Sequence, residues 1–229
     1  MNKTGDNALA SLSKKEERLI DDGTPVISDR AYNVTIGLVV LYGIVVNALL
    51  CNYCTDFVMS INPVVLLIGY IVLVIAGSVI AYSSKNPAIS FLGYNMIVLP
   101  LGAVLTVLVR EYDSDVVFHA FVMTALITAI MLVAATIWPE FFIKLGGVLF
   151  IGLIGIIIAN LVFGLLFRWD TGIIAIASSA LFSLYIGFDW CKAQKYVMSL
   201  DNAVDSAIDI YMDIILLFTY LLQIFGRRS

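Results

Sequence analysis

Four aspartates recur at every fourth position near the end of the chain: Asp201, Asp205, Asp209 and Asp213. Four residues turn an α-helix by about 400°, so each carboxylate is displaced by only about 40° from the last, and all four share one side of a helix. The apolar run ILLFTYLLQIFG follows at 215–226. An aspartate at the centre of a membrane-spanning helix costs about 2.5 to 3.5 kcal/mol on the insertion scale. We therefore expect the acidic stripe to face protein or water rather than lipid.

These aspartates are expected at different depths in the membrane, and a fifth aspartate, Asp189, belongs with them. Asp189 lies among apolar and aromatic residues in the segment LFSLYIGFDW. In an antiparallel hairpin that turns near Asp201, Asp189 and Asp213 are each twelve residues from the turn, so we predict that they lie at the same depth. Asp201 and Asp205 are predicted to lie at a solvated inner surface, where the helix dipole favours acidic residues. Asp209 is expected at intermediate depth.

A pair of buried carboxyl groups has a specific chemistry. Two carboxylates in contact in a low-dielectric site cannot both ionise easily, so such a pair shares a proton. When the pair shares a proton, its negative charge is low enough for the two carboxyl groups to stay together. When both groups are ionised, they repel each other and offer oxygen ligands to a hard cation such as calcium. We interpret Asp189 and Asp213 as a titratable latch that responds to pH and can bind calcium transiently when ionised, with Asp205 and Asp209 lining the way to it along the helix. The alternative is a structural buried acid capped by hydroxyl groups.

The composition indicates what must position these residues. Of 229 residues, 61% are hydrophobic and only 13% are charged, which is typical of an integral membrane protein. We predict an all-α bundle of seven transmembrane helices in one domain at 31–229, after a polar tail at 1–30. The last helix is expected in the centre, wrapped by the other six, because its carboxylates make it costly to expose to lipid. The predicted spans are 33–51, 63–82, 88–109, 115–138, 143–167, 171–190 and 203–226.

The distribution of basic residues predicts the orientation of the chain. With the N-terminus inside, nine Lys and Arg residues fall on inner segments and four on outer ones, which favours a cytoplasmic N-terminus. Seven spans place the C-terminus outside, whereas six spans and a re-entrant last segment return it inside. No basic patch indicates nucleic acid as a partner.

Several stretches resemble one known family. They are LFSLYIGFD, IDIYMDIILLFTYLLQIFG, VVFHAFVMTA and AYNVTIGLVVLYGIVVN. They are similar to the Bax inhibitor-1 family, the transmembrane Bax-inhibitor-motif proteins, and in particular to its bacterial branch. The resemblance implies seven helices around a central last helix and a pH-sensitive calcium leak gated by an aspartate pair that corresponds to Asp189 and Asp213. It implies a protein of the bacterial plasma membrane that is not an enzyme. It also implies a monomer or a weak oligomer. Lipids, calcium ions and protons would be its partners, with no cofactor beyond calcium as transported ion.

The chain departs from this family pattern at two places. Some bacterial members carry an arginine at the inner end of the second helix, where it holds the aspartate pair closed. Here the corresponding residues read AYSSKN, so Ser83, Ser84 and Lys85 are the candidate latch. Related chains can also carry a glutamate in the fourth helix where this one has a histidine. The candidate outer mouth, which would concentrate cations, comprises His119, Asp113 and Asp115. A packing histidine and an ordinary solvated loop are the alternatives.

Other functions remain open. An intramembrane aspartyl protease also needs two aspartates on adjacent helices. Such enzymes carry GxGD and PAL motifs, whereas this chain has YIGFD in place of GxGD and contains no PAL sequence. A proton-coupled transporter would favour inverted repeats, and none is visible. A retinal protein needs a lysine in the last helix, and 203–226 contain none. A cytoprotective scaffold that acts through protein partners, which the sequence does not identify, is a further alternative.

Overall fold

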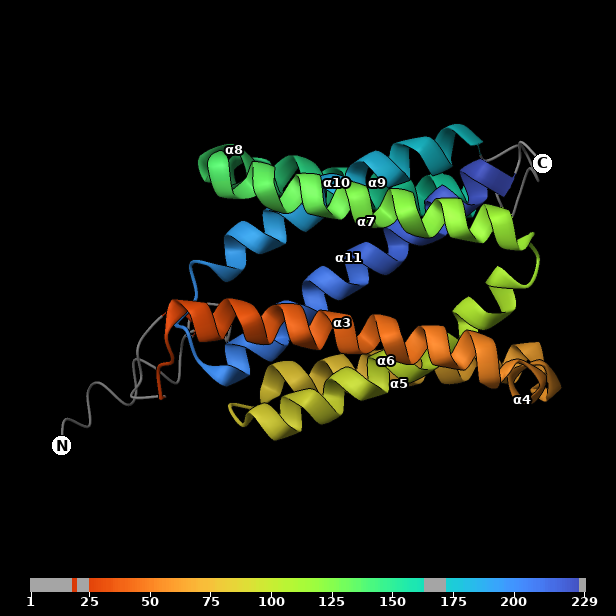
Figure 1. Cartoon of the computed structure of the whole chain (residues 1–229), viewed down its shortest axis with the longest axis horizontal. Coiled ribbons are helices and arrows are strands. Elements are labelled where there is room, and N and C mark those ends of the chain that lie inside the picture. Colours follow the sequence, from red (N-terminus) through yellow and green to blue (C-terminus); the bar gives the residue numbers. More distant parts are fainter. Residues whose placement is uncertain (1–17, 20–24, 163–171, 227–229) are drawn as a thin grey trace.

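The computed structural model describes residues 18–19, 25–162 and 172–226, and within these ranges all regular secondary structure is helical (Figure 1). Six of the described helices are long and apolar enough to cross a membrane. They are α3 (Asp29–Tyr53), α5 (Pro63–Ser83), α6 (Pro87–Val109), α7 (Ser114–Ile137), α10 (Gly172–Ala193) and α11 (Leu200–Gly226). Shorter helices are α4 (Thr55–Ser60), α8 (Pro139–Lys144) and α9 (Gly146–Ala159). The prediction of an all-helical, multi-pass membrane protein is confirmed.

The described residues contain six of the seven predicted spans as long helices, and the fifth is described only in part. Pro139 begins the separate short helix α8 after α7, because proline cannot continue the hydrogen-bonding ladder of the preceding helix. The apolar helical segment that includes α9 runs over Gly146–Val162, which is 17 residues or about 25 Å at 1.5 Å per residue. The remainder of the predicted span, at 163–167, lies outside the described residues.

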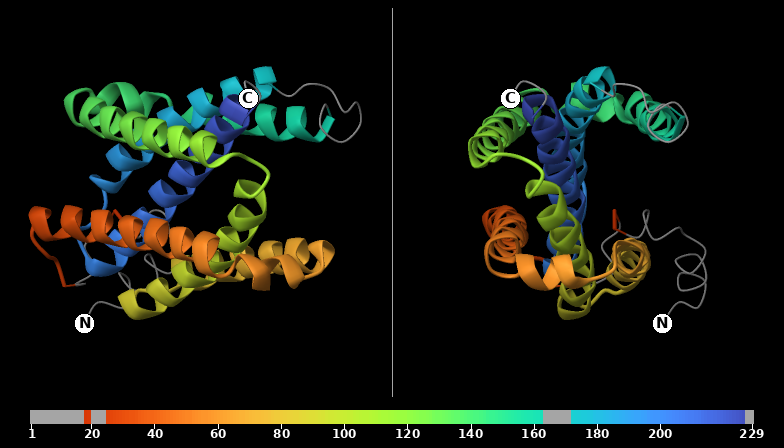
Figure 2. Two further views of the ribbon diagram at one scale, coloured as in Figure 1. Left: turned by 45° about the vertical axis from the view of Figure 1, so that its right-hand side comes forward. Right: turned by 90° about the vertical axis from the view of Figure 1, so that its right-hand side faces the viewer.

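The last helix is the most buried of the long helices. Over half of the apolar window of α11 is buried, and the helix packs against α3, α6, α7 and α10. Figure 2 shows α11 running obliquely between a group formed by α3, α5 and α6 and a group formed by α7, α9 and α10. The helices α5 and α9 pack chiefly on α6 and α10, respectively, rather than directly on α11. The acidic stripe is therefore carried into the interior of the bundle.

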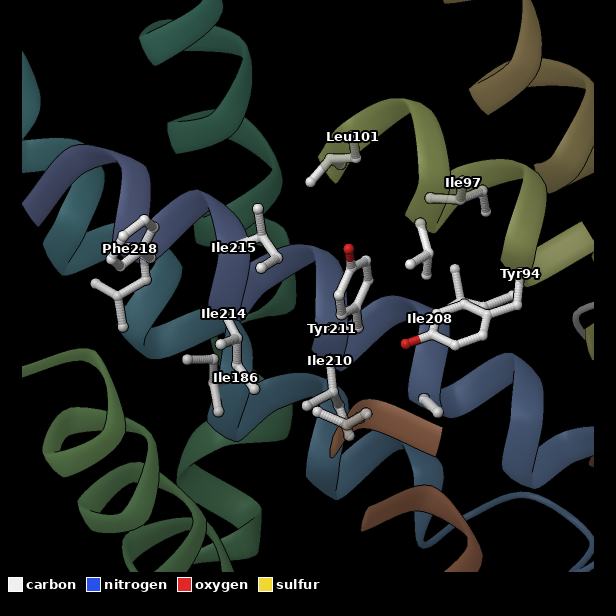
Figure 3. Packing of buried hydrophobic residues seen from close by; sticks show 14 of the residues in the cluster. Tyr94, Ile97, Leu101, Ile186, Ile208, Ile210, Tyr211, Ile214, Ile215 and Phe218 are labelled. Atoms are coloured by element: carbon white, nitrogen blue, oxygen red, sulfur yellow. The ribbon is translucent and has the colours of Figure 1, made fainter. Parts of the chain in front are cut away.

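Apolar and aromatic side chains of α11 and its neighbours pack against one another (Figure 3). Tyr211 of α11 meets Tyr94 of α6 edge to face, with ring centroids 5.3 Å apart. The Tyr211 hydroxyl accepts a hydrogen bond of 2.6 Å from the Asn47 amide of α3, which ties the same ring to a third helix. This arrangement places the polar end of a buried aromatic residue on a partner, as burial requires.

The helices begin at residues suited to that position. Asn62 and Asn86 each precede a proline, and each side chain accepts a hydrogen bond from the backbone N–H two residues later. An asparagine N-cap followed by proline is a strong start signal, because the cap satisfies a free N–H and proline is preorganised for the first turn. The start of α11 is capped by the Ser199 hydroxyl, which accepts from the Asn202 N–H.

The α5–α6 hairpin depends on a close approach of two glycines. A β-carbon added to Gly77 would lie 2.6 Å from the Gly93 carbonyl oxygen, and one added to Gly93 would lie 2.5 Å from the Gly77 carbonyl oxygen. Contacts this short are not tolerated, so any larger residue must separate the helices. Small residues allow close backbone approach between membrane helices, where van der Waals packing drives association.

We expect Gly77→Ala to lower the stability of the protein by about 1 to 3 kcal/mol, the usual cost of overpacking. The matched control is Gly69→Ala on the same helix, because nothing lies within 4 Å of a β-carbon added there. The control should be neutral or slightly stabilising, since alanine favours the helix over glycine. Unfolding in detergent micelles measures both variants, and equal stability of the two would contradict the close contact.

Candidate functional site

Asp189 of α10 and Asp213 of α11 lie close together. Both residues are buried, with exposed fractions of 8% and 6%. Their carboxyl groups are near enough to interact electrostatically with each other. Two carboxyl groups can form a hydrogen bond with each other only when one of them is protonated. The predicted turn near Asp201 is wrong, because α10 ends at Ala193 and α11 begins at Leu200. Asp189 lies four residues before the end of α10, whereas Asp213 lies 13 residues after the start of α11.

A lysine accompanies the pair. The Lys192 ammonium donates to Asp189 Oδ1 at 2.9 Å and to Asp209 Oδ2 at 2.8 Å. It therefore bridges α10 and α11 one turn away from the paired carboxyl groups. Asp209 is close enough to interact electrostatically with both Asp189 and Asp213. Three carboxyl groups thus surround one ammonium, so the cluster retains excess negative charge unless a proton or another cation is present.

Helix α5 adds a hydroxyl group to this cluster. Tyr82 donates a hydrogen bond of 2.5 Å to Asp209 Oδ1, so both oxygens of that carboxylate have partners. Tyr185, one turn before Asp189, is half-buried and close enough to interact electrostatically with the paired aspartates. We call Asp189, Asp209, Asp213, Lys192 and Tyr82 the acidic cluster.

The inner part of the stripe is buried, contrary to the prediction of a solvated surface. Asp205 has an exposed fraction of only 1% and lies 3.9 Å from the guanidinium of Arg18. Asp201 has an exposed fraction of 6%, and its carboxylate accepts a hydrogen bond of 2.6 Å from Ser90 of α6. The physical reason is that the Ser90 hydroxyl of α6 and the Arg18 guanidinium, which precedes α3, lie beside these carboxylates in place of water. Asp201 and Asp205 therefore do not lie at a solvated surface in this structure.

The candidate latch residues lie at the end of α5. Ser83 and Lys85 are exposed. Ser84 accepts a hydrogen bond from the Asn86 N–H at 2.9 Å, which stabilises the turn into α6. The α5 side chain that reaches the acidic cluster is Tyr82, immediately before them in the sequence.

The candidate outer mouth lies at the start of α7. Asp113, Asp115 and His119 are all exposed there. The His119 Nδ1 atom lies 2.6 Å from the Asp115 carbonyl oxygen of its own helix, and its ring packs against Phe118. The three residues therefore share a surface, but the histidine is engaged with its own helix rather than with a second polar side chain.

Sequence reasoning missed Lys192, Tyr82 and Arg18. Lys192 was assigned to the inner loop by counting basic residues, although its spacing of three from Asp189 permits a salt bridge on one helix face. That spacing was the available signal. No local pattern links Tyr82 or Arg18 to the last helix, because each is more than a hundred residues away from its partner.

The described residues include no cluster of three or more His, Cys, Asp or Glu side chains that could hold a metal ion. Calcium usually takes six to eight oxygen ligands. In this arrangement the Lys192 ammonium occupies the carboxylate oxygens that a calcium ion would otherwise approach. A calcium ion would therefore have to displace Lys192 or pass when the pair separates.

Comparison with known proteins decides the family. The family model described as "Inhibitor of apoptosis-promoting Bax1" matches residues 27–229, which is nearly the whole chain. The chain belongs to the Bax inhibitor-1 family. The predicted resemblance to that family is thus confirmed, and the match includes all of the acidic cluster but excludes Arg18.

Two curated proteins from Helicobacter pylori strains J99 and 26695 are similar to this Bax inhibitor-1 family member. They are 32% and 31% identical over 129 residues, and both are described as uncharacterized proteins. The matched region covers 55% of this chain and 54% of each relative, so the chain spans about half the length of the curated relatives it matches.

Proposed function

We propose that this protein is a pH-sensitive calcium leak channel, gated by the proton shared between Asp189 and Asp213. The observation that carries the proposal is the proximity of two buried carboxyl groups beside a single ammonium. Two such groups can stay close together only while they share a proton. The stability of this pair therefore depends on pH, which is the property required of a pH sensor.

The sign of the response follows from the charges around the pair. Lys192, Asp209, Tyr82 and Tyr185 are the titratable groups that surround it. At low pH the shared proton and Lys192 balance most of the negative charge, and the pair holds α10 and α11 together. When the pH rises and the proton is lost, the carboxylates repel each other and attract a divalent cation. We therefore expect calcium flux to increase as the pH is raised.

We further propose that the protein is a bundle of seven spans with α11 at its centre. It would lie in a bacterial plasma membrane with its N-terminus in the cytoplasm. The burial of α11 and its contacts with four neighbouring helices support a central path along it. Lipid, calcium ions and protons are the proposed partners, and the protein acts as a monomer or weak oligomer. The proposal requires no catalysis and no resident cofactor.

Reconstitution in liposomes tests the proposal. Calcium entry is followed with an internal dye at several pH values for the wild type and for Asp189→Asn. The wild-type rate is expected to rise with pH and the variant rate to be insensitive to pH, because one partner can no longer ionise. Asp56→Asn, at an exposed position of α4, is the control and should behave as the wild type.

Two results would contradict a channel. Equal flux at every pH in both proteins would exclude a gate at this pair. Absence of flux together with cleavage of a membrane substrate, lost in Asp189→Asn, would favour an intramembrane aspartyl protease instead. Absence of both activities would leave the scaffold that acts through protein partners.

A further inference from the structure

Arg18 is held against the start of α11 by several contacts. Its Nε atom donates to Asn202 Oδ1 at 3.0 Å and lies 3.9 Å from Asp205 Oδ2. Its Nη2 group donates to the Asn202 carbonyl oxygen and to Ser206 Oγ, each at 3.3 Å. The Arg18 side chain is only 10% exposed. An arginine with its donors used in this way is a fixed part of the structure and not a solvated surface charge.

The same residue is also attached to the connection between α10 and α11. Its guanidinium lies over the Tyr196 ring, 4.0 Å from the ring centroid, which is a cation–π contact. Its carbonyl oxygen accepts a hydrogen bond of 2.9 Å from the Val197 N–H. The main chain and the side chain of Arg18 thus both contact the region where the connection between α10 and α11 meets the start of α11. This region adjoins the inner end of the acidic stripe.

The position of Arg18 matters because of the charges that follow it along α11. Asp205 is one turn before Asp209, which belongs to the acidic cluster. A cation that approached Asp209 from the start of α11 would pass Asp205, where a permanently charged guanidinium already lies. Electrostatic repulsion would oppose this approach, and the guanidinium also occupies the space beside Asn202 and Ser206.

We propose that Arg18 is an intramolecular lock that closes the inner end of the acidic stripe by taking the place of a permeating cation. This inference rests on the proposed channel function and adds a second cation in series with Lys192. Arg18 precedes the residues matched by the family model, which begin at 27. Arg18 therefore lies outside the matched region.

Arg18→Gln tests the lock, because glutamine keeps polar contacts but lacks the charge. Calcium entry into liposomes at a pH where the wild type is nearly closed is expected to rise about tenfold, within the range by which charges in a cleft change local ion concentrations. Arg18→Lys should stay close to the wild type. Arg30→Gln, at an exposed position of α3, is the matched control and should have no effect.

A double-variant cycle with Asp205→Asn identifies the partner. If Arg18 acts through Asp205, the effect of Arg18→Gln on flux should be markedly smaller in the Asp205→Asn background, because the carboxylate that attracts the entering ion is then absent. Flux in Arg18→Gln equal to that of the wild type, or an undiminished effect in the Asp205→Asn background, would overturn the lock.

Hydrogen exchange separates failure of the lock from failure of the channel. The Val197 amide, which donates to the Arg18 carbonyl oxygen, should exchange faster in Arg18→Gln than in the wild type if the side chain anchors this contact. Unchanged exchange would show that Arg18 does not hold the connection, whatever the flux. A protein without flux at any pH but with faster exchange in the variant would refute the channel and, with it, the role of Arg18 as a lock, while retaining its structural contact.

Discussion

Asp213→Asn is expected to lower calcium flux at alkaline pH by about tenfold or more and to remove its pH dependence. The asparagine amide can donate to Asp189 in place of the shared proton, so the closed contact is kept and cannot be broken by ionisation. Two unit charges about 4 Å apart repel by about 4 kcal/mol at an effective dielectric constant of about 20. Even part of that energy changes the ratio of open to closed molecules by about tenfold.

The measurement is calcium entry into liposomes across a pH series, with Asp201→Asn as the control. Asp201 lies on the same stripe twelve residues earlier and is bonded to Ser90 rather than to the acidic cluster. The control should retain a pH-dependent flux. A pH response in Asp213→Asn equal to that of the wild type would show that the proton sensor lies elsewhere.

Lys192→Met is expected to destabilise the protein by about 3 to 5 kcal/mol, the usual cost of removing one member of a buried ion pair. The Lys192 side chain is 24% exposed and binds two carboxylates, Asp189 and Asp209, which would both lose their ammonium partner. Methionine keeps most of the apolar volume, so the loss reports charge rather than packing. Urea-induced unfolding in detergent micelles measures the difference.

The control for this variant is Lys195→Met, one turn further on and exposed, which should have little effect. Adding Asp209→Asn to Lys192→Met should restore part of the stability, because one of the two unpaired charges is then removed. Equal stability of Lys192→Met and the wild type, or no recovery in the double variant, would contradict the bridging role of this lysine.

The pairing of Asp189 with Asp213 was predicted from their residue types and from an antiparallel hairpin that turns near Asp201. The predicted position of the turn was wrong, because the connection between α10 and α11 lies at 194–199 and Asp201 is already part of α11. The two aspartates are therefore not equidistant from the turn, and the acidic residue types were the better signal. Asp209 lies at the edge of the cluster because it is one helical turn from Asp213.

The counter-ions could not be predicted in the same way. Tyr82 and Arg18 reach α11 from distant parts of the chain, and no periodicity specifies which helices are neighbours. Asp205 was predicted to lie in solvent because a helix start is usually solvated, but the nearby Arg18 guanidinium stabilises the buried carboxylate. The predicted fifth span at 143–167 begins within α8 and extends past Val162, where this described stretch of the chain ends, so its full length stays a prediction.

The two hydroxyl groups that the α5–α6 hairpin places on the acidic stripe have a consequence for the conduction cycle. Tyr82 donates to Asp209, and Ser90 donates to Asp201. A hydroxyl group can donate to a carboxylate and can equally accept from a protonated carboxyl group, whereas an ammonium can only donate. The hairpin can therefore stay attached to α11 through every protonation state of the stripe. The pair of Asp189 and Asp213, by contrast, links α10 to α11 only while a proton is shared, and it repels once both carboxyl groups are ionised. Any rearrangement should therefore separate α10 from α11 and leave the hairpin as the stationary part.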